Sequence, residues 1–374
     1  MSNEPPDTTA ESDFEPLRAT RRTALRGAGL AGLLALGAGS ATAQRTDPSA
    51  NAHLSRNETA EVLPSWNDGQ TKQAILTFVE AVTTPDSPDF VPPAERIATF
   101  DNDGTLWVER PVYAQLAFTV DRIQELAPQH PEWEDEQHFQ AALENDLETL
   151  AAVSQQELVE LLTATHAGMT TAEFEEIVTD WLNTARHPRF DRRYTELAYQ
   201  PMLELLSFLR ANEFETFIVS GGGVDFMRPM SEPTYGIPPE QVVGSTGKTR
   251  YEIRDGEPVL VKLPEIDFVD DEDGKPIGIQ KFIGRQPIAA FGNYVGDREM
   301  LEWADAGDGP RLYLLVNHDD AEREYTYSMD EDLTGEVVDE SAQPFIDVAA
   351  ERGWVVTSMK DDWKYVFPFE QADS

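Results

Sequence analysis

The amino-acid sequence predicts an α/β fold, and two observations carry that prediction. Short apolar runs of strand length recur along the chain, at 97–100, 214–219, 287–291 and 311–316. Segments with helical periodicity separate these runs. The first run leads directly into Asp101-Asn102-Asp103-Gly104. Acidic residues at the carboxyl end of a strand lie where open α/β sheets bind their ligands, so we expect a functional site there.

Composition sets the first limits on function. The chain has 374 residues and is 40% hydrophobic, enough for one large domain with an insertion or for two domains. Its net charge is −40, from 69 acidic and 29 basic residues, of which only 7 are lysine. This balance argues against nucleic acid or an anionic membrane as a partner. It favours a halophilic source, where salt screens self-repulsion, over an ordinary solvated surface. The chain lacks cysteine, which excludes disulfides, thiolate metal sites and cysteine catalysis.

Residues 1–43 have the pattern of an export signal. A basic stretch containing Arg21 and Arg22 precedes an apolar Gly- and Ala-rich stretch, and Ala41-Thr42-Ala43 follows as a cleavage pattern. The paired arginines resemble a twin-arginine signal. We therefore expect an exported protein, extracellular, periplasmic or at the cell surface, without stable membrane insertion after cleavage. An uncleaved anchor is the alternative. Residues 44–65 are polar and are expected to form a linker.

Helices dominate the next part of the chain. The apolar spacing in 66–82 predicts the first helix. Four more are expected before residue 184, at 112–126, 135–152, 155–165 and 171–183. Ser154 and Thr170 are expected to be N-caps, because each has a glutamate three residues later.

The second half of the chain alternates between the two element types. Helices are expected at 199–209, 224–230 and 345–352, and further strands at 241–244 and 354–357. A β insertion is expected over 245–274, with Asp255-Gly256 as a hairpin turn. The acidic run 270–273 is expected to be a solvated loop, with a calcium site as the alternative. A rim or capping role is expected for His318-Asp319-Asp320, and packing on the core for the aromatic C-terminal tail.

Asp101 and Asp103 are two residues apart, so both can face one side as the strand ends. Adjacent carboxylates repel each other unless a cation or a shared proton lies between them. Mg²⁺ is the natural partner for such hard oxygen ligands. The alternative is an ordinary surface turn.

Three later segments have residues suited to phosphate. The run 214–219 ends in Ser220-Gly221-Gly222-Gly223, where a small hydroxyl and unhindered amides can cradle a phosphate. Lys275 precedes a proline that can begin a helix, and Lys281 follows nearby. After the run 287–291 the sequence reads Gly292-Asn293-Tyr294-Val295-Gly296-Asp297.

Together these segments resemble the four motifs of the haloacid dehalogenase superfamily, in the family's order over 97–301. The resemblance implies a doubly wound, Rossmann-like core with a parallel sheet, at 66–111 and 200–374. It also implies a helical cap inserted after the first strand, at 112–199. Trp107, Glu109 and Arg110 are candidates for a rim facing that cap, and a structural role is the alternative.

The resemblance also implies roles for individual residues. Asp101 would be the nucleophile and Asp103 the general acid and base. Ser220, Gly221, Gly222 and Lys275 would bind phosphate, and Lys275 is preferred over Lys281 for its family-like distance to the fourth motif. Mg²⁺ would be held by Asp101, the Asp103 carbonyl, Asn293 and Asp297. Asn293 departs from the family's aspartate, so a weaker metal site is expected.

The implied function is a Mg²⁺-dependent phosphatase that hydrolyses small organic phosphomonoesters through an aspartyl-phosphate. The closest resemblance is to the phosphoserine-phosphatase-like branch. The alternative is a non-catalytic, exported protein that binds phosphate or metal at a decayed site. A dehalogenase is disfavoured, because Asp103 marks the phosphatase branch.

Overall fold

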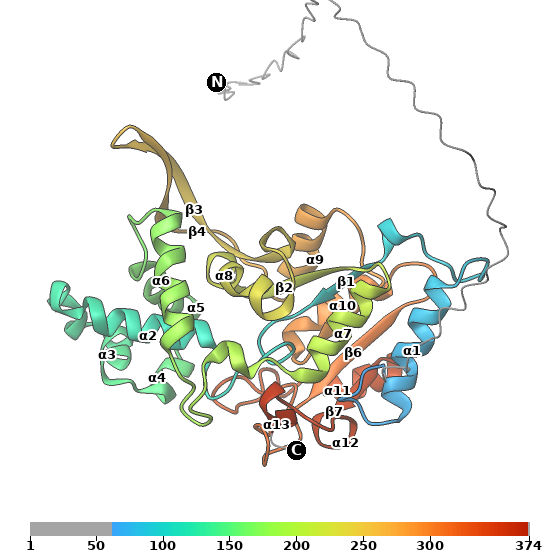
Figure 1. Cartoon of the computed structure of the whole chain (residues 1–374). Coiled ribbons are helices and arrows are strands. Elements are labelled where there is room, and N and C mark those ends of the chain that lie inside the picture. The colour runs from blue at the N-terminus through green and yellow to red at the C-terminus, as the bar shows by residue number, and fades with distance from the viewer. Residues whose placement is uncertain (1–61, 373–374) are drawn as a thin grey trace, which may run out of the picture. The chain divides into compact units, whose positions relative to one another are not determined.

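A computed structural model describes residues 62–372 of the chain, so the expected export signal and most of the expected linker lie outside the described residues. The core is one seven-stranded sheet with the order β4-β3-β2-β1-β5-β6-β7 (Figure 1). Its strands are β1 (Ile97–Phe100), β2 (Glu215–Gly223), β3 (Val242–Arg254), β4 (Glu257–Phe268), β5 (Ala289–Gly292), β6 (Leu312–Asn317) and β7 (Val355–Ser358).

All neighbouring strands are parallel except β3 and β4, which form an antiparallel hairpin. The chain leaves β1 toward β2 and β3 on one side, and then returns to β5, β6 and β7 on the other. The strand order therefore reverses at β1 and β5, where such sheets form a crevice at the carboxyl ends of the strands. The predicted α/β, doubly wound fold is confirmed.

Helices cover both faces of the sheet because its strands bury alternate residues on opposite sides. On one face, Ile218 and Phe291 pack with α1 (Gln70–Thr83), α7 (Gln200–Ala211) and α8 (Val224–Tyr235). On the other, Val219 and Ala290 pack with α10 (Arg298–Asp305) and α11 (Phe345–Arg352). The result is a three-layer core whose polar strand ends face one edge.

The segment between β1 and β2 is helical. Its helices are α2 (Ala114–Leu126), α3 (Gln137–Glu144), α4 (Leu147–Ala151), α5 (Gln155–Ala164) and α6 (Thr171–Thr184). Helices α2 to α5 share a hydrophobic cluster of their own, whereas Phe174 and Val178 of α6 belong to the core cluster that includes α8. The segment thus has its own packing but is attached to the core through α6 and through Phe118 of α2.

The capping prediction is confirmed, because Ser154 and Thr170 both form complete capping boxes. The expectation of a single helix over 135–152 is wrong. Asn145 adopts a left-handed conformation (φ 55°) that ends α3, and Asp146 then caps α4 by accepting a hydrogen bond from the Thr149 amide. Asparagine readily adopts the left-handed conformation that ends a helix, and aspartate is a favourable N-cap for the next one.

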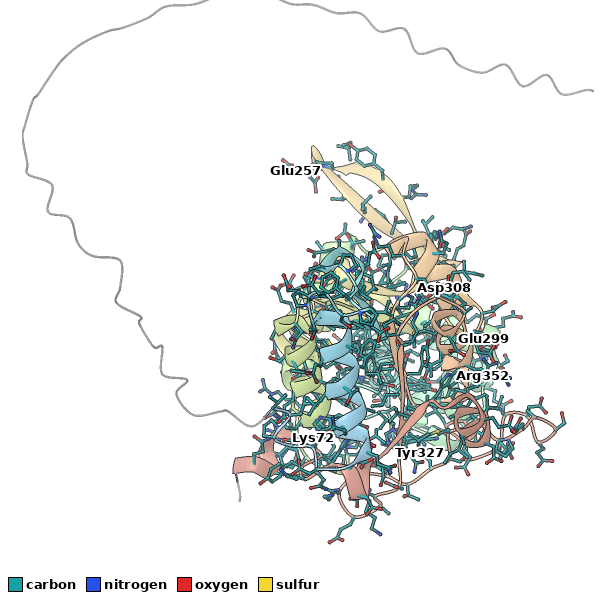
Figure 2. All side chains as sticks on the ribbon, turned by 90° about the vertical axis from the view of Figure 1, so that its right-hand side faces the viewer. Lys72, Glu257, Glu299, Asp308, Tyr327 and Arg352 are labelled. Atoms are coloured by element: carbon teal, nitrogen blue, oxygen red, sulfur yellow. The ribbon has the colours of Figure 1, made fainter. Side chains whose placement is uncertain are left out.

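The β insertion differs from the expected arrangement in one respect. The short strand expected at 241–244 and the first strand of the insertion form the single long strand β3. No proline interrupts this stretch, so the hydrogen-bonded ladder continues outward through the hairpin. Figures 1 and 2 show the hairpin projecting from the sheet, with Glu257 near its tip.

Three short helices complete the described chain. Helix α9 (Gly274–Gly278) lies between β4 and β5, and α12 (Met359–Asp362) and α13 (Pro368–Ala372) follow β7. The expected packing of the aromatic tail is confirmed: Trp363 contacts Trp66 edge to face, and Phe367 is fully buried. Within residues 62–372, no helix combines the length and the apolar character that a bilayer crossing requires.

Candidate active site

The site is built at the carboxyl ends of three adjacent strands. Asp101 follows β1 directly, and its amide donates a 2.9 Å hydrogen bond to the Phe291 carbonyl of β5. Ser220 lies near the end of β2, and Asn293 follows β5. Because parallel neighbours end at the same edge, residues separated by up to 192 positions in sequence meet here.

Lys275 links the two acidic motifs. Its Nζ donates to Asp101 Oδ1 at 2.7 Å and to Asp297 Oδ1 at 2.5 Å, and all three side chains are buried. Lys275 lies inside the short helix α9 rather than before it. Lys281 instead packs its ammonium over the rings of Phe268 and Phe282. The structure thus places Lys275, not Lys281, at the carboxylates.

The two neighbouring carboxylates favour the charged form of Lys275. Burial works against the ammonium, but Asp101 and Asp297 outweigh it and raise the Lys275 pKa well above its usual value. Burial also raises the pKa of Asp101, as does the nearby Asp297, while Lys275 opposes the shift. A further cation near Asp101 would favour its ionised, nucleophilic form.

Asp297 and Asn293 hold each other in place. Asp297 Oδ2 accepts hydrogen bonds from the amides of Asn293 (2.9 Å) and Tyr294 (3.1 Å), while Oδ1 accepts from Lys275. Both Asp297 oxygens are therefore engaged within the protein. Gly292 permits this approach, because a Cβ there would lie 2.5 Å from Asp297 Oδ2.

Glu109 supplies a carboxylate beside the neutral Asn293. The Asn293 side chain donates from Nδ2 to Glu109 Oε1 at 3.0 Å, and its Oδ1 accepts from Thr105 Oγ1 at 3.0 Å. Burial raises the Glu109 pKa, and His318 partly offsets this shift. The sequence indicated Glu109 only as a rim candidate. Its contact with Asn293 depends on the path of the loop after Gly104, which no sequence spacing predicts.

Asp103 has the environment of a proton-transfer group. Its Oδ1 accepts a 2.9 Å hydrogen bond from Trp107 Nε1, and part of its surface is open to the cavity described below. Enclosure by protein on the other sides raises its pKa to about 6. A pKa near neutrality suits a group that both gives and takes a proton. Trp107 therefore orients Asp103 rather than forming a rim.

The loop that carries both aspartates is fixed from below. Gly104 has a φ of +73°, which other residues rarely adopt. Its carbonyl accepts a 2.8 Å hydrogen bond from His318 Nε2, and Glu324 Oε2 lies 3.0 Å from His318 Nδ1. The ring is therefore held on both sides, by the Gly104 carbonyl and by the Glu324 carboxyl group. His318 thus supports the loop from a buried position and forms neither the rim nor the cap that was expected for it.

The glycine-rich end of β2 faces the same space. Ser220 is buried, and its Oγ accepts a 3.2 Å hydrogen bond from the Gly222 amide. Gln115 of α2 reaches across from the helical segment and accepts from the Gly223 amide through Oε1 at 2.8 Å. Ser220, Gly221 and Gly222 thus lie beside the carboxylates, and Gln115, which sequence reasoning missed, connects them to α2.

A cavity of about 310 Å³ unites these groups. Its polar base, here called the cavity floor, contains Asp101, Asp103, Glu109, Ser220, Lys275, Asn293 and Asp297. Its apolar side, here called the helical wall, consists of Leu116, Leu150, Val153, Leu158 and Leu162, from α2 to α5. Tyr113, Asp271, Tyr294, Asp332 and Leu333 complete much of the rim.

Arg110 and the acidic run 270–273 were also candidates, and only Asp271 of these residues lines the cavity. The Arg110 guanidinium stacks on Tyr327, 4.3 Å from the ring centroid. Within the acidic run, Asp271 lines the cavity, whereas Asp270 is fully buried and neither of its oxygens accepts a hydrogen bond from the described chain. Burial raises the Asp270 pKa to about 7. The run is therefore only partly the solvated loop that was expected.

The donor set fits a hard divalent cation. Six carboxylates line the cavity, from Asp101, Asp103, Glu109, Asp271, Asp297 and Asp332. Lys275 is the one basic residue among the described residues that line it. A phosphate dianion would meet strong repulsion in this cavity unless a cation shared its charge. Oxygen ligands of this kind are those that Mg²⁺ prefers.

Fold and site together define a doubly wound α/β protein with an acidic ligand site at the point where the strand order reverses. The family model for haloacid dehalogenase-like hydrolases matches residues 98–302, from β1 into α10. The match covers more than half of the 374 residues, and the chain belongs to this family.

Solved structures are similar to this chain at low sequence identity. A protein of unknown function from Bordetella pertussis Tohama I is 13% identical with a TM-score of 0.43, and the match covers 70% of this chain and 97% of that chain. A phosphoserine phosphohydrolase-like protein from Francisella tularensis is 16% identical with a TM-score of 0.35, and the match covers 68% of this chain and 99% of that chain. A probable phosphoserine phosphatase from Vibrio cholerae is 15% identical with a TM-score of 0.36, and the match covers 66% of this chain and 65% of that chain. A search of the curated proteins finds no match.

Proposed function

We propose that this protein is a Mg²⁺-dependent phosphatase that hydrolyses small organic phosphomonoesters through an aspartyl-phosphate on Asp101. One observation carries the proposal: Lys275 binds Asp101 at 2.7 Å in the same cavity that holds Asp103 and the Ser220 loop. This arrangement has a nucleophile, a fixed positive charge and a proton-transfer group around one space large enough for a small ester. Membership in the hydrolase family supports the same chemistry.

In the first step, an Asp101 carboxylate oxygen attacks phosphorus and the ester P–O bond breaks. Asp103 gives its proton to the departing alkoxide, which leaves as the alcohol. Lys275 and the amides after Ser220 stabilise the negative charge on the equatorial oxygens. The products of this step are the alcohol and an aspartyl-phosphate.

In the second step, Asp103, now ionised, takes a proton from water as that water attacks phosphorus. The bond between phosphorus and the Asp101 oxygen breaks, which releases inorganic phosphate and restores both carboxyl groups. The Asp103 pKa of about 6 allows this residue to act in both directions near neutral pH.

We propose that Asp101, the Asp103 carbonyl and Asn293 would hold Mg²⁺, with Asp297 contributing through water because Lys275 and two amides engage its oxygens. The ion, when bound, offsets charge on the phosphoryl oxygens and on Asp101. Glu109 adds the negative charge that Asn293 lacks, from 3.0 Å away. This neighbour argues against the alternative of a decayed, non-catalytic site.

The helical wall supports a preference among substrates. Five aliphatic side chains face the floor, and none of them can pair with a charged group. We propose that the alcohol part of the substrate is uncharged and largely apolar. The wall offers no cation for a carboxylate, so it does not favour phosphoserine itself.

The test is hydrolysis of nitrophenyl phosphate in molar KCl, with and without Mg²⁺, by the wild type and by Asp101→Asn. We expect turnover that requires Mg²⁺ and falls by roughly 10⁴-fold or more in the variant. Folded wild-type protein without turnover, on this ester and on a panel of small monoesters, would contradict the proposal. In that case activity gained by Asn293→Asp would indicate the decayed site.

A further inference from the structure

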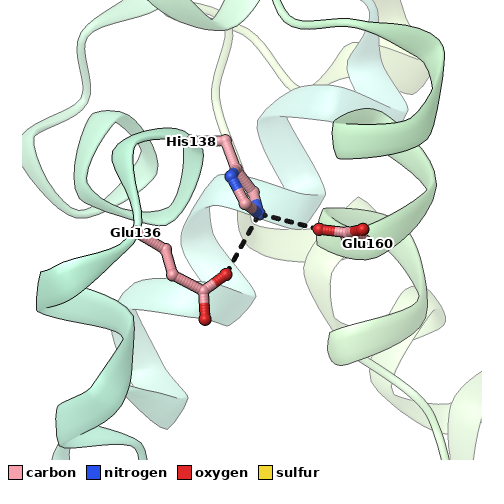
Figure 3. Close-up of side chains that lie close together, drawn as sticks. All are labelled: Glu136, His138 and Glu160. Carbon is pink, nitrogen blue, oxygen red and sulfur yellow. Dashed lines mark ion pairs between the residues drawn. The ribbon is translucent and has the colours of Figure 1, made fainter.

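A histidine and two glutamates converge in the helical segment, outside the catalytic cavity (Figure 3). Glu136 and His138 lie at the start of α3, and Glu160 lies on α5. His138 Nε2 is 3.3 Å from Glu160 Oε2 and 3.6 Å from Glu136 Oε2. One ligand atom from each residue lies within 4.8 Å of the others. The three side chains therefore surround a space of the size of one ion.

His138 itself points to a ligand. The residue is only 8% exposed, and its Nε2 is buried without a hydrogen bond to any described residue. Both carboxylates lie close to this nitrogen, but neither accepts a hydrogen bond from it: Glu136 Oε2 is too distant, and Glu160 Oε2 lies off the direction of an N–H bond. A buried ring nitrogen without a partner is costly, and so are two carboxylates that share one space. A cation between the three side chains removes both costs.

The other side of the ring agrees with this assignment. His138 Nδ1 faces Glu157 Oε1 at 4.0 Å. Histidines that bind metals commonly turn their second ring N–H toward a carboxylate, which leaves the lone pair of the first nitrogen for the ion. A proton on Nδ1 would face the Glu157 carboxylate, and Nε2 would then be free to act as a ligand.

The donor set and the spacing select the ion. Zn²⁺ binds imidazole nitrogen and carboxylate oxygen at about 2.0–2.2 Å in tetrahedral sites, so its ligand atoms lie roughly 3.3–3.5 Å apart. The two nitrogen–oxygen distances of 3.3 and 3.6 Å match this spacing. Mg²⁺ and Ca²⁺ prefer sites made of oxygen alone, whereas imidazole favours Zn²⁺ and similar transition metals.

We propose that Glu136, His138 and Glu160 form a Zn²⁺ site that ties α3 to α5, with water as the fourth ligand. On α5, Leu158 and Leu162 line the catalytic cavity, two residues before and after Glu160. A step of two residues turns about 200° around a helix, so Glu160 lies on the opposite face. Zinc would therefore fix the position of the helical wall without competing for the cavity floor. The proposal does not depend on the phosphatase reaction.

The experiment measures zinc bound by the full chain after dialysis against micromolar Zn²⁺ in molar KCl with excess Mg²⁺, which suppresses binding to ordinary surface carboxylates. His138→Gln and Glu160→Gln remove ligands. His130→Gln is the matched control, because His130 is a more exposed histidine on the same segment with one glutamate at 2.9 Å. Thermal unfolding with and without Zn²⁺ is recorded for each protein.

We expect the wild type and His130→Gln to bind one more Zn²⁺ per chain than His138→Gln, and to unfold at a higher temperature when Zn²⁺ is present. Glu160→Gln should weaken binding at least as much as the roughly 10- to 100-fold lost when an outer partner of a ligand is removed. Equal zinc content in all four proteins, or none in the wild type, would overturn the site and leave His138 as a simple ion-pair partner.

Circular dichroism reports whether each variant folds. If His138→Gln does not fold, Glu160→Gln decides the question, because Glu160 is partly exposed and its loss leaves no buried gap. Co²⁺ then serves as a spectroscopic probe of the same proteins. A visible band of four-coordinate Co²⁺ in the wild type that Glu160→Gln lacks would support the site, and the same band in both would overturn it.

Discussion

The cavity floor and the helical wall face the same cavity but are held in different ways. On the floor, Asp101, Lys275 and Asp297 are joined by hydrogen bonds of 2.5 to 2.7 Å, and Asn293 is held by Thr105 and Glu109. The wall side chains contribute aliphatic surface and no hydrogen bonds, and their helices pack around a separate hydrophobic cluster.

This difference teaches how the two tasks of the site are divided. A floor fixed by directional bonds can place charge and protons within tenths of an ångström. A wall fixed by packing can change its side chains and keep its helices. Changes to the floor should therefore alter the rate for every substrate, whereas changes to the wall should alter the choice among substrates.

The largest effect after loss of Asp101 is expected for Asp103→Asn. The amide keeps the hydrogen bond from Trp107 but cannot give a proton, so kcat/KM for an alkyl phosphate should fall by about 10²- to 10⁴-fold. Nitrophenolate leaves without a proton, so kcat/KM for nitrophenyl phosphate should fall less. An equal loss for both esters would contradict the role given to Asp103.

The pH dependence of kcat/KM in the wild type should report the protonation of Asp103. Because Asp103 must be protonated in the first step and its pKa is about 6, kcat/KM for the alkyl ester should decline as the pH rises above 6. In Asp103→Asn this decline should disappear.

A smaller effect on the floor is expected for Glu109→Gln. Gln keeps an acceptor for Asn293 Nδ2 but removes the charge. The Mg²⁺ concentration for half-maximal activity should therefore rise by about tenfold, while kcat at saturating Mg²⁺ changes little. Titration of activity with Mg²⁺ measures this shift, and an unchanged midpoint would show that Glu109 does not act through the metal.

On the wall, Leu162→Ala should separate substrates. Removing part of an aliphatic contact should lower kcat/KM for naphthyl phosphate by up to about tenfold and leave methyl phosphate within about twofold. Leu203→Ala is the matched control, since Leu203 packs against the core rather than lining the cavity. An equal loss of kcat/KM for both esters would contradict the idea that the wall, unlike the floor, determines the choice among substrates.

The smallest effect concerns stability rather than rate. Asp270 is buried with a pKa of about 7, so the folded protein keeps a proton that the unfolded chain releases above pH 4. Its contribution to stability is therefore present at low pH and is lost as the pH rises toward 7. Asp270→Asn should unfold about 2–5 °C higher than the wild type at pH 8 and show little difference at pH 4.

Melting curves across this pH range give the comparison. Asp273→Asn, which changes another exposed carboxylate of the same acidic run, is the control and should show no such pH-dependent difference. A constant difference between Asp270→Asn and the wild type at all pH values would mean that Asp270 is charged throughout.

The sequence contains enough information for the floor because its parts follow strands. Asp101, Ser220 and Asn293 each end a short apolar run, and parallel pairing of β2, β1 and β5 brings such ends to one edge. The contact of Glu109 with Asn293 and the role of Gln115 were not predicted, because they depend on a loop path and on where α2 docks.

The wall was unpredictable for a related reason. Helix periodicity shows that α5 has apolar residues but not which of them face the cavity rather than the cluster with α2 and α3. Leu162 lines the cavity and Leu161 belongs to that cluster, while Leu158 contacts both. The break at Asn145, by contrast, had a local signal in the Asn-Asp pair.

The most direct test of the central claim is to trap the phosphoryl group on the enzyme. The wild type and Asp101→Asn are mixed with a ³²P-labelled monoester and Mg²⁺, quenched in acid and digested for peptide mapping. We predict label on the peptide that contains Asp101, released by hydroxylamine as expected for an acyl phosphate, and no label in the variant. Production of inorganic phosphate without labelled protein, or label on another residue, would contradict the account.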